Sequence, residues 1–95
     1  MAIQSFKQDQ WAAIYKGERS GKGVQADLVS VARRKLRMLN QARALNDLRV
    51  PPGNQLKALQ DARAGQYAIR INDQFRICFV WSAQGPLDVE IVDYH

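Results

Sequence analysis

Four side chains in the second half of the chain have the types that metal-free cleavage of RNA requires. They are Lys57, Arg76, Tyr94 and His95. Cleavage by the neighbouring 2′-hydroxyl needs a proton acceptor, a proton donor for the leaving oxygen and positive charge beside the phosphate. An imidazole can exchange protons near neutral pH, and arginine or lysine can hold the phosphate charge. These residues could therefore support such a reaction, provided that the fold brings them together.

Other catalytic chemistries are poorly supported by the sequence. The chain has one histidine and one cysteine, and its carboxylates show no metal-ligand spacing, so we expect neither a metal nor another cofactor. Cys78 lies among apolar residues, where a buried and inert thiol is the commoner case. His95 is the last residue and is also compatible with an exposed chain end.

Three alternating runs in the last third of the chain must position the candidate residues. Strict alternation of apolar and polar residues predicts half-buried strands, and the short connections at 72–74 and 83–86 predict antiparallel neighbours. The apolar positions are Tyr67, Ile69 and Ile71, then Phe75, Ile77, Phe79 and Trp81, then Leu87, Val89 and Ile91. We expect the opposite face to display Arg70, Asn72, Arg76, Asp88, Glu90 and Tyr94.

Two helices are predicted before this sheet, over residues 8–16 and 26–45. The second has one apolar stripe at three- and four-residue steps, formed by Leu28, Val31, Ala32, Leu36, Leu39, Ala42 and Leu45. Its remaining surface carries Arg33, Arg34, Lys35, Arg37 and Arg43. Residues 2–6 could form an edge strand, and the prolines at 51 and 52 end the helical region. The expected fold is a single α+β domain over residues 1–95, with two N-terminal helices packed on a twisted, mainly antiparallel β-sheet.

The charge distribution narrows the class of partner. The net charge is +5, and all 14 lysines and arginines lie between Lys7 and Arg76. A basic body suits a polyanion such as RNA or the ribosome, although the helical arginines are equally compatible with a solvated helix surface. No apolar run approaches membrane-spanning length, the N-terminus lacks a signal-peptide layout, and a single cysteine suits a reducing compartment. We expect a cytoplasmic protein that does not bind membranes.

The C-terminal half resembles a known family. The segment PPGNQLKALQDARAGQYAIRINDQFRICFVW, followed by DVEIVDYH, is similar to the HigB branch of the RelE toxin superfamily. The resemblance implies a bacterial type II toxin that enters the ribosomal A site and cleaves mRNA during translation. It also implies a helix-turn-helix antitoxin of the HigA type, through which alone the complex would bind operator DNA.

The resemblance also assigns roles to individual residues. Arg76 matches the strand arginine that holds the scissile phosphate. Asp93, Tyr94 and His95 match the terminal catalytic trio, with His95 as the main proton-transfer group. Lys57 falls where some members have a histidine, and Arg63 matches the turn arginine. RNA contacts are expected from Arg63 and Arg70 and from the helical residues Arg33, Arg34, Arg37 and Arg43.

One departure keeps two further functions open. Gln60 stands close to the place where such toxins often carry a lysine, so a cation is missing before the turn arginine. A ribosome- or RNA-binding inhibitor without turnover is therefore the first alternative. A ParE-like gyrase inhibitor of the same fold is the second, although the AspTyrHis end and Arg76 argue against it.

Overall fold

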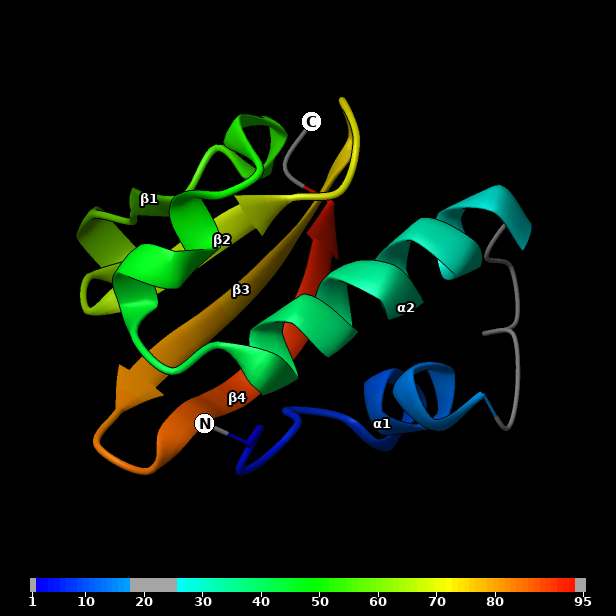
Figure 1. Ribbon diagram of the computed structural model, residues 1–95, viewed down its shortest axis with the longest axis horizontal. Helices are drawn as coiled ribbons and strands as arrows, with labels where there is room; N and C mark the ends of the chain where they lie inside the picture. The colour runs from blue at the N-terminus through cyan, green and yellow to red at the C-terminus, as the bar shows by residue number, and fades with distance from the viewer. Residues whose placement is uncertain (1, 18–25, 94–95) are drawn as a thin grey trace.

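The helices of this protein lie on one side of a four-stranded antiparallel sheet (Figure 1). The computed structural model describes residues 2–17 and 26–93. Its α-helices are α1 (Asp9–Lys16) and α2 (Ala26–Gln41), and its strands are β1 (Lys57–Ala58), β2 (Gln66–Arg70), β3 (Phe75–Ser82) and β4 (Gly85–Asp93). Short 3-10 helices η1 (Leu45–Arg49) and η2 (Pro52–Asn54) connect α2 to β1, and η3 (Asp61–Arg63) lies between β1 and β2. The sheet order β1-β2-β3-β4 follows the chain, which confirms the predicted α+β architecture.

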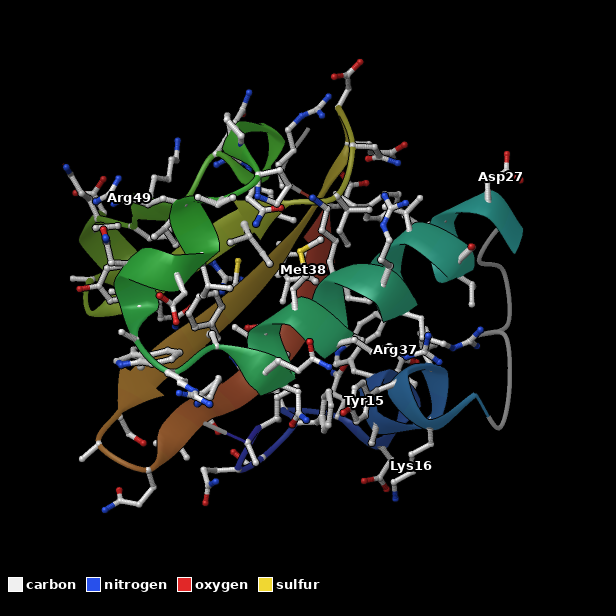
Figure 2. The ribbon with its side chains drawn as sticks, viewed as in Figure 1. Tyr15, Lys16, Asp27, Arg37, Met38 and Arg49 are labelled. Atoms are coloured by element: carbon white, nitrogen blue, oxygen red, sulfur yellow. The ribbon has the colours of Figure 1, made fainter. Side chains whose placement is uncertain are left out.

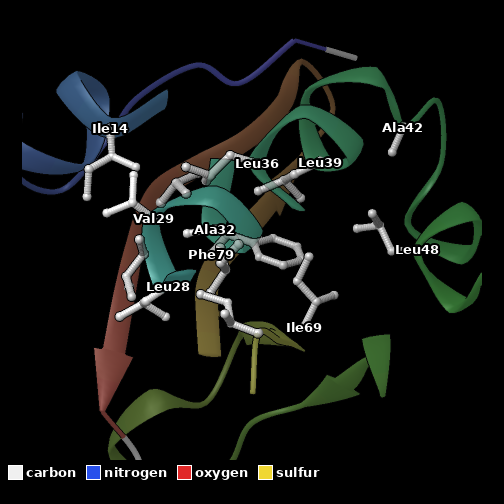
Figure 3. Packing of buried hydrophobic residues seen from close by; sticks show 14 residues of the cluster. Ile14, Leu28, Val29, Ala32, Leu36, Leu39, Ala42, Leu48, Ile69 and Phe79 are labelled. Atoms are coloured by element: carbon white, nitrogen blue, oxygen red, sulfur yellow. The ribbon is translucent and has the colours of Figure 1, made fainter. Parts of the chain in front are cut away.

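The hydrophobic core forms between α2 and one face of the sheet. Ile77 and Phe79 of β3 are fully buried in one cluster with Leu36 of α2. Figure 3 shows Phe79 and Leu36 in this cluster. Alternation along β3 sends these side chains to one face, as the sequence pattern predicted. Burial of each such side chain contributes about 1.5–3 kcal/mol, so this layer anchors the sheet to the helix. The opposite face, which α1 and α2 leave uncovered, is called the open face below.

The predicted side-chain pattern fails at the start of β4. Val89 and Ile91 are buried in the core as expected, but the pairing of β3 with β4 shifts between Cys78 and Val80. Leu87 consequently pairs with Val80, whose side chain faces away from the core. Because a one-residue slip reverses which face a side chain occupies, Leu87 lies on the open face rather than in the core. The extra residue is Asp88, which has a positive φ of 52°.

Helix α2 is shorter than its apolar stripe predicted. It ends at Gln41, and Leu45 belongs to the 3-10 helix η1. The carboxylate of Asp47 accepts hydrogen bonds from the backbone N–H groups of Arg43, at 3.0 Å, and Ala44, at 3.2 Å. By binding these N–H groups, the aspartate takes the donors that another turn of α2 would use for its own hydrogen bonds, which explains why the helix ends at Gln41.

A buried polar contact ties the connecting segment to α2. Asn54 is completely buried and Lys35 is 7% exposed, which corrects the expectation that Lys35 lies on a solvated helix surface. The Lys35 ammonium donates to Asn54 Oδ1, and Asn54 Nδ2 donates to the carbonyls of Leu48, at 3.1 Å, and Val50, at 3.4 Å. Burial, followed by the nearby charges of Arg34 and Arg70, lowers the pKa of Lys35. This contact holds the segment that leads to β1.

The N-terminal segment extends the sheet beyond β4. Phe6 forms a parallel bridge with Val89, and the Gln4 N–H donates to the Pro86 carbonyl at 2.8 Å. The prediction of an edge strand over residues 2–6 is thus supported in position, although only Phe6 forms a bridge. Helix α1 ends at Lys16, and Gly17 follows it with a φ of 76°, which suits glycine at a helix C-terminus. No α-helix within residues 2–17 and 26–93 is long and apolar enough to cross a membrane.

Candidate functional site

The strand register gathers cations on the open face. Lys57 pairs with Ala68 across β1 and β2, Ala68 pairs with Cys78, and Cys78 pairs with Glu90. Residues directly opposite one another in antiparallel strands project from the same face. Since the neighbours of Cys78 in β3 are buried in the core, this row of four residues lies on the open face. The sheet therefore brings Lys57 to the face that carries Arg76.

Two arginines lie directly opposite each other at one end of this face. Arg70 of β2 pairs with Arg76 of β3, and opposed residues of this kind have Cβ atoms about 4.5–5.5 Å apart. Arg70 also forms an ion pair with Asp73 in the β2–β3 turn. Like charges directly opposite each other repel, so the arginine pair is kept at some cost in stability, which the Asp73 carboxylate beside Arg70 reduces. Such an arrangement favours an anionic ligand.

Arg63 reaches the same face from the turn before β2. Its Nη1 donates to Gln66 Oε1 and to Glu90 Oε2, both at 3.1 Å. Lys7 binds the same Glu90 oxygen from the N-terminal segment at 3.2 Å. The carboxylate of Glu90 is 15% exposed and therefore partly shielded from solvent. Neither Lys7 nor Glu90 was assigned a function from the sequence, because no local pattern reveals contacts between residues 83 positions apart.

Cys78 lies among these charged side chains, and its thiol has the features of an unreactive cysteine. The thiol is 3% exposed, and burial raises its pKa. The nearby cations Arg63, Arg76 and Lys7 oppose this shift, while Glu90 adds to it. Because desolvation is the largest of these effects, the thiol stays protonated at neutral pH. This finding supports the expectation of a buried, inert cysteine and argues against nucleophilic catalysis by Cys78.

The C-terminal trio is described only at its first residue. Asp93 ends β4 opposite Phe75, next to the position of Arg76 in the ladder. Its carboxylate accepts a hydrogen bond from Gln74 Nε2 at 2.9 Å. Asp93 thus lies at the end of the sheet where Arg70 and Arg76 meet, but its side chain shares the face of Phe75, opposite to the face of the two arginines. Tyr94 and His95 lie outside the described residues, so their proposed roles still depend on the sequence alone.

The helical arginines occupy the other side of the molecule. Arg34 and Arg37 are exposed on α2, and Arg43 is exposed just after it; Figure 2 shows Arg37 in the helical layer together with Lys16 of α1. Arg33 differs, because it is only partly exposed and its Nε donates to the Ile14 carbonyl at 2.8 Å. It therefore caps the end of α1. These arginines belong to the helical layer, whereas Arg63, Arg70 and Arg76 belong to the sheet and its turns, so the structure divides the predicted RNA-binding cations between two layers (Figure 1).

The cations of the open face are not accompanied by a metal site in the described parts of the chain. No group of three or more His, Cys, Asp or Glu side chains there could hold a metal ion. What the arrangement offers is positive charge and hydrogen-bond donors. Four of its cations were expected from the sequence, namely Lys57, Arg63, Arg70 and Arg76, and Lys7 adds a fifth. This set can bind a phosphodiester backbone and stabilise negative charge on a phosphate.

Comparisons with known proteins agree with one another. The family model for the RelE-like toxin of the type II toxin–antitoxin system HigB matches residues 4–95. Toxin HigB-1 of Vibrio cholerae serotype O1 is 35% identical over 82 residues, which cover 85% of this chain and 84% of that protein. An uncharacterized protein of Haemophilus influenzae is 32% identical over 76 residues, covering 80% and 75%.

A solved structure supports the fold. The YoeB/ParE toxin from Agrobacterium tumefaciens aligns with a TM-score of 0.52 and covers 98% of this chain and 94% of its own. Its sequence identity of 16% is low, so the likeness concerns the fold alone.

Proposed function

This chain belongs to the HigB-like toxins of type II toxin–antitoxin systems, members of the RelE superfamily, and on that premise we propose that it is a ribosome-dependent endoribonuclease. In this proposal it enters the ribosomal A site, cleaves mRNA without a metal ion and thereby inhibits translation. The substrate bond is an RNA phosphodiester, and the attacking group is the adjacent 2′-hydroxyl.

The observation that carries the proposal is the cross-strand pair of Arg70 and Arg76. Negative charge accumulates on the phosphate as the 2′-oxygen attacks, and fixed cations stabilise that charge most when they are already in place. Arg76 is the proposed transition-state contact, while Arg70 and Arg63 hold the flanking backbone. Lys57 projects from β1 onto the same face and supplies a further cation.

Proton transfer is assigned to the end of the chain. Asp93 ends β4 beside the first residues of β3, so the chain leaves the sheet next to the arginine pair. We assign His95 as the main proton-transfer group because an imidazole can both accept and donate a proton near neutral pH. Tyr94 would help to place the RNA, and Asp93 would contribute to the catalytic arrangement.

The partners follow from the family. A toxin of a type II system has an antitoxin, and we propose one of the helix-turn-helix HigA type. Operator DNA would be bound through that antitoxin. The exposed residues Arg34, Arg37 and Arg43 would contact ribosomal RNA from the helical side while the open face holds mRNA. Arg33 contributes less in this scheme, because its guanidinium already binds the Ile14 carbonyl.

A non-cleaving translation inhibitor is the second candidate, and Gln60 is the residue that favours it. Gln60 directly precedes η3, the 3-10 helix that carries Arg63. A neutral side chain there leaves the face with one cation fewer than the family often has. Such a protein would still bind the A site through the remaining cations and would stall translation without cutting the message.

Primer extension on mRNA from cells that express the chain tests the proposal. Discrete, translation-dependent cuts are expected, and Arg76→Ala should reduce them on the order of 10²-fold while remaining folded. Arg76→Lys should restore only part of the loss, because one ammonium cannot replace the planar guanidinium fork. Arg49→Ala removes an exposed arginine outside the open face and serves as the matched control. Stalled translation without cuts would favour the second candidate, and a supercoiling defect would indicate gyrase.

A further inference from the structure

Glu90 is the one acid in the row of residues that crosses the open face. A single oxygen of its carboxylate, Oε2, accepts hydrogen bonds from Arg63 Nη1, at 3.1 Å, and Lys7 Nζ, at 3.2 Å. The two cations come from opposite sides, Lys7 from the segment beside β4 and Arg63 from the turn before β2. With Cys78 between them, the three charged side chains form one connected group.

We infer that Glu90 is a positioning residue, whose carboxylate holds the Arg63 guanidinium flat across the open face so that its other edge faces an RNA phosphate. This inference rests on the proposed function, because it assigns Arg63 a phosphate to bind. It assigns Glu90 no contact with the substrate. Its effect on RNA is exerted through Arg63.

The hydrogen bonds of Arg63 indicate this orientation. Both of its bonds, to Gln66 and to Glu90, use Nη1. A guanidinium has five N–H donors arranged in a rigid plane. Within the described part of the chain, Nε and Nη2 of Arg63 make no hydrogen bond, and 37% of the side chain is exposed. Fixing one corner of the plane leaves the Nε–Nη2 edge available, and this is an edge that binds phosphate oxygens in pairs.

The sheet residues beneath the Arg63 side chain are small enough to let its guanidinium lie close to the sheet. To reach Glu90 on β4 from the turn before β2, the side chain passes over Ala68 and Cys78, which are opposite each other in the ladder. Both residues are small, and they are 0% and 3% exposed. Larger side chains at these positions would lift the guanidinium away from the sheet. The charges of Arg63, Arg76, Lys7 and Glu90 all influence the Cys78 thiol, which places them around the same point.

Glu90 could instead compete with RNA for Arg63, and this alternative predicts the opposite effect on RNA binding. If Glu90 competes with RNA for Arg63, removing its charge should strengthen RNA binding. If it positions Arg63, removing it should weaken binding, because a long side chain must then be ordered when RNA arrives. The net charge change favours tighter binding in either case, so weaker binding would be specific evidence for positioning.

The test compares five variants with the wild type: Glu90→Gln, Glu90→Ala, Asp88→Asn, Arg63→Ala, and Arg63→Ala combined with Glu90→Gln. Each is measured for binding of a short, single-stranded 2′-O-methyl RNA, followed by fluorescence anisotropy. Glu90→Gln and Glu90→Ala should weaken binding by roughly two- to tenfold, with the glutamine closer to wild type because it keeps an acceptor. Asp88→Asn is the matched control: it removes an exposed carboxylate from the same strand, and asparagine tolerates the positive φ at that position. This control should bind as tightly as wild type or slightly tighter. In the background of Arg63→Ala, Glu90→Gln should cause no further loss.

A second measurement separates this inference from the proposed function. Side-chain NMR of Arg63 reports rotation about its Cζ–Nε bond, which should be slow in the wild type and faster in Glu90→Gln. Equal rotation rates, or equal RNA affinities for Glu90→Gln and Asp88→Asn, would overturn the positioning role and leave the nuclease proposal intact. Tighter binding by both Glu90 variants would identify Glu90 as a competitor. A wild type that neither binds nor cleaves RNA overturns both the nuclease proposal and the phosphate contact of Arg63, whatever the rotation rates.

Discussion

Removal of the Asn54 side chain should destabilise this protein severely, although Asn54 lies outside the proposed active site. The side chain is completely buried and bonds four partners, namely the Lys35 ammonium, the carbonyls of Leu48 and Val50 and, at 3.9 Å, the Met38 sulfur. Asn54→Ala leaves the Lys35 ammonium and the carbonyls of Leu48 and Val50 without their amide partner. Each buried polar group left unsatisfied costs about 1–3 kcal/mol, and a charged group costs more. Allowing for partial relaxation of the two carbonyls, we expect a loss of about 3–5 kcal/mol.

Thermal and chemical unfolding followed by circular dichroism measure this loss. For a domain of this size, each kcal/mol lowers the Tm by about 4–8 °C, so the Tm should fall by roughly 12–40 °C. Asn46→Ala is the control, since it deletes an exposed amide that accepts a hydrogen bond from the exposed Arg49, and it should change stability by about 0.5 kcal/mol or less. A loss below about 1 kcal/mol for Asn54→Ala would refute the assigned role.

The same contact gives a pH dependence with a defined sign. Burial lowers the pKa of Lys35 in the folded chain from its ordinary 10.5. Between the lowered value and 10.5 the unfolded chain binds more protons than the folded chain, so Lys35 makes the free energy of unfolding rise with pH. Lys35→Met should remove this contribution. The difference between wild type and variant should therefore shift in favour of the wild type as the pH rises through that interval.

Three further predictions concern individual side chains. Arg33→Ala should lower the free energy of unfolding by about 1–2 kcal/mol, because it removes a charged donor from the end of α1. The control Arg34→Ala should change it by no more than about 0.5 kcal/mol. Equal effects of the two variants in urea unfolding would contradict the capping role of Arg33. Combined removal of the charges of Arg34, Arg37 and Arg43 should weaken ribosome binding and reduce its salt dependence, and an unchanged salt slope would indicate a merely solvated surface. Cys78 should react with iodoacetamide far more slowly in the folded than in the urea-unfolded chain, and rapid labelling of the folded chain would contradict its burial.

The sheet was predictable from the sequence because its determinants are local. Alternation in β3 identified Ile77 and Phe79 as core residues, and short connections identified antiparallel pairing. The same reasoning predicted Leu87 in the core, and this prediction is wrong. The register shift between Cys78 and Val80 depends on how β3 and β4 pair, which the sequence of one strand does not show. The apolar pattern also predicted that α2 continues to Leu45. Periodicity does not show that the Asp47 carboxylate accepts hydrogen bonds from the backbone N–H groups of Arg43 and Ala44.

The candidate site was predictable only in its arginines and its β1 lysine. The polar side of the alternating runs indicated Arg70 and Arg76, and the register confirms that they are neighbours. Lys7 and Glu90 were missed as partners because their contact joins the two ends of the chain. Lys35 was expected in solvent, since a lysine beside an apolar stripe normally extends outwards. Its burial depends on Asn54, which no helical pattern could reveal.

Cleavage of A-site mRNA by the chain without its last residue tests the central claim most directly. Purified wild type and a variant that ends at Tyr94 would be mixed with programmed ribosomes, and single-turnover cleavage would be followed over time. Loss of an acid–base group costs about 10²–10⁴-fold, so removal of His95 should slow cleavage by that factor, with Tm and antitoxin binding almost unchanged. If the shortened chain cuts mRNA at a rate close to that of the wild type, His95 is not the proton-transfer group and the proposed catalytic arrangement is wrong.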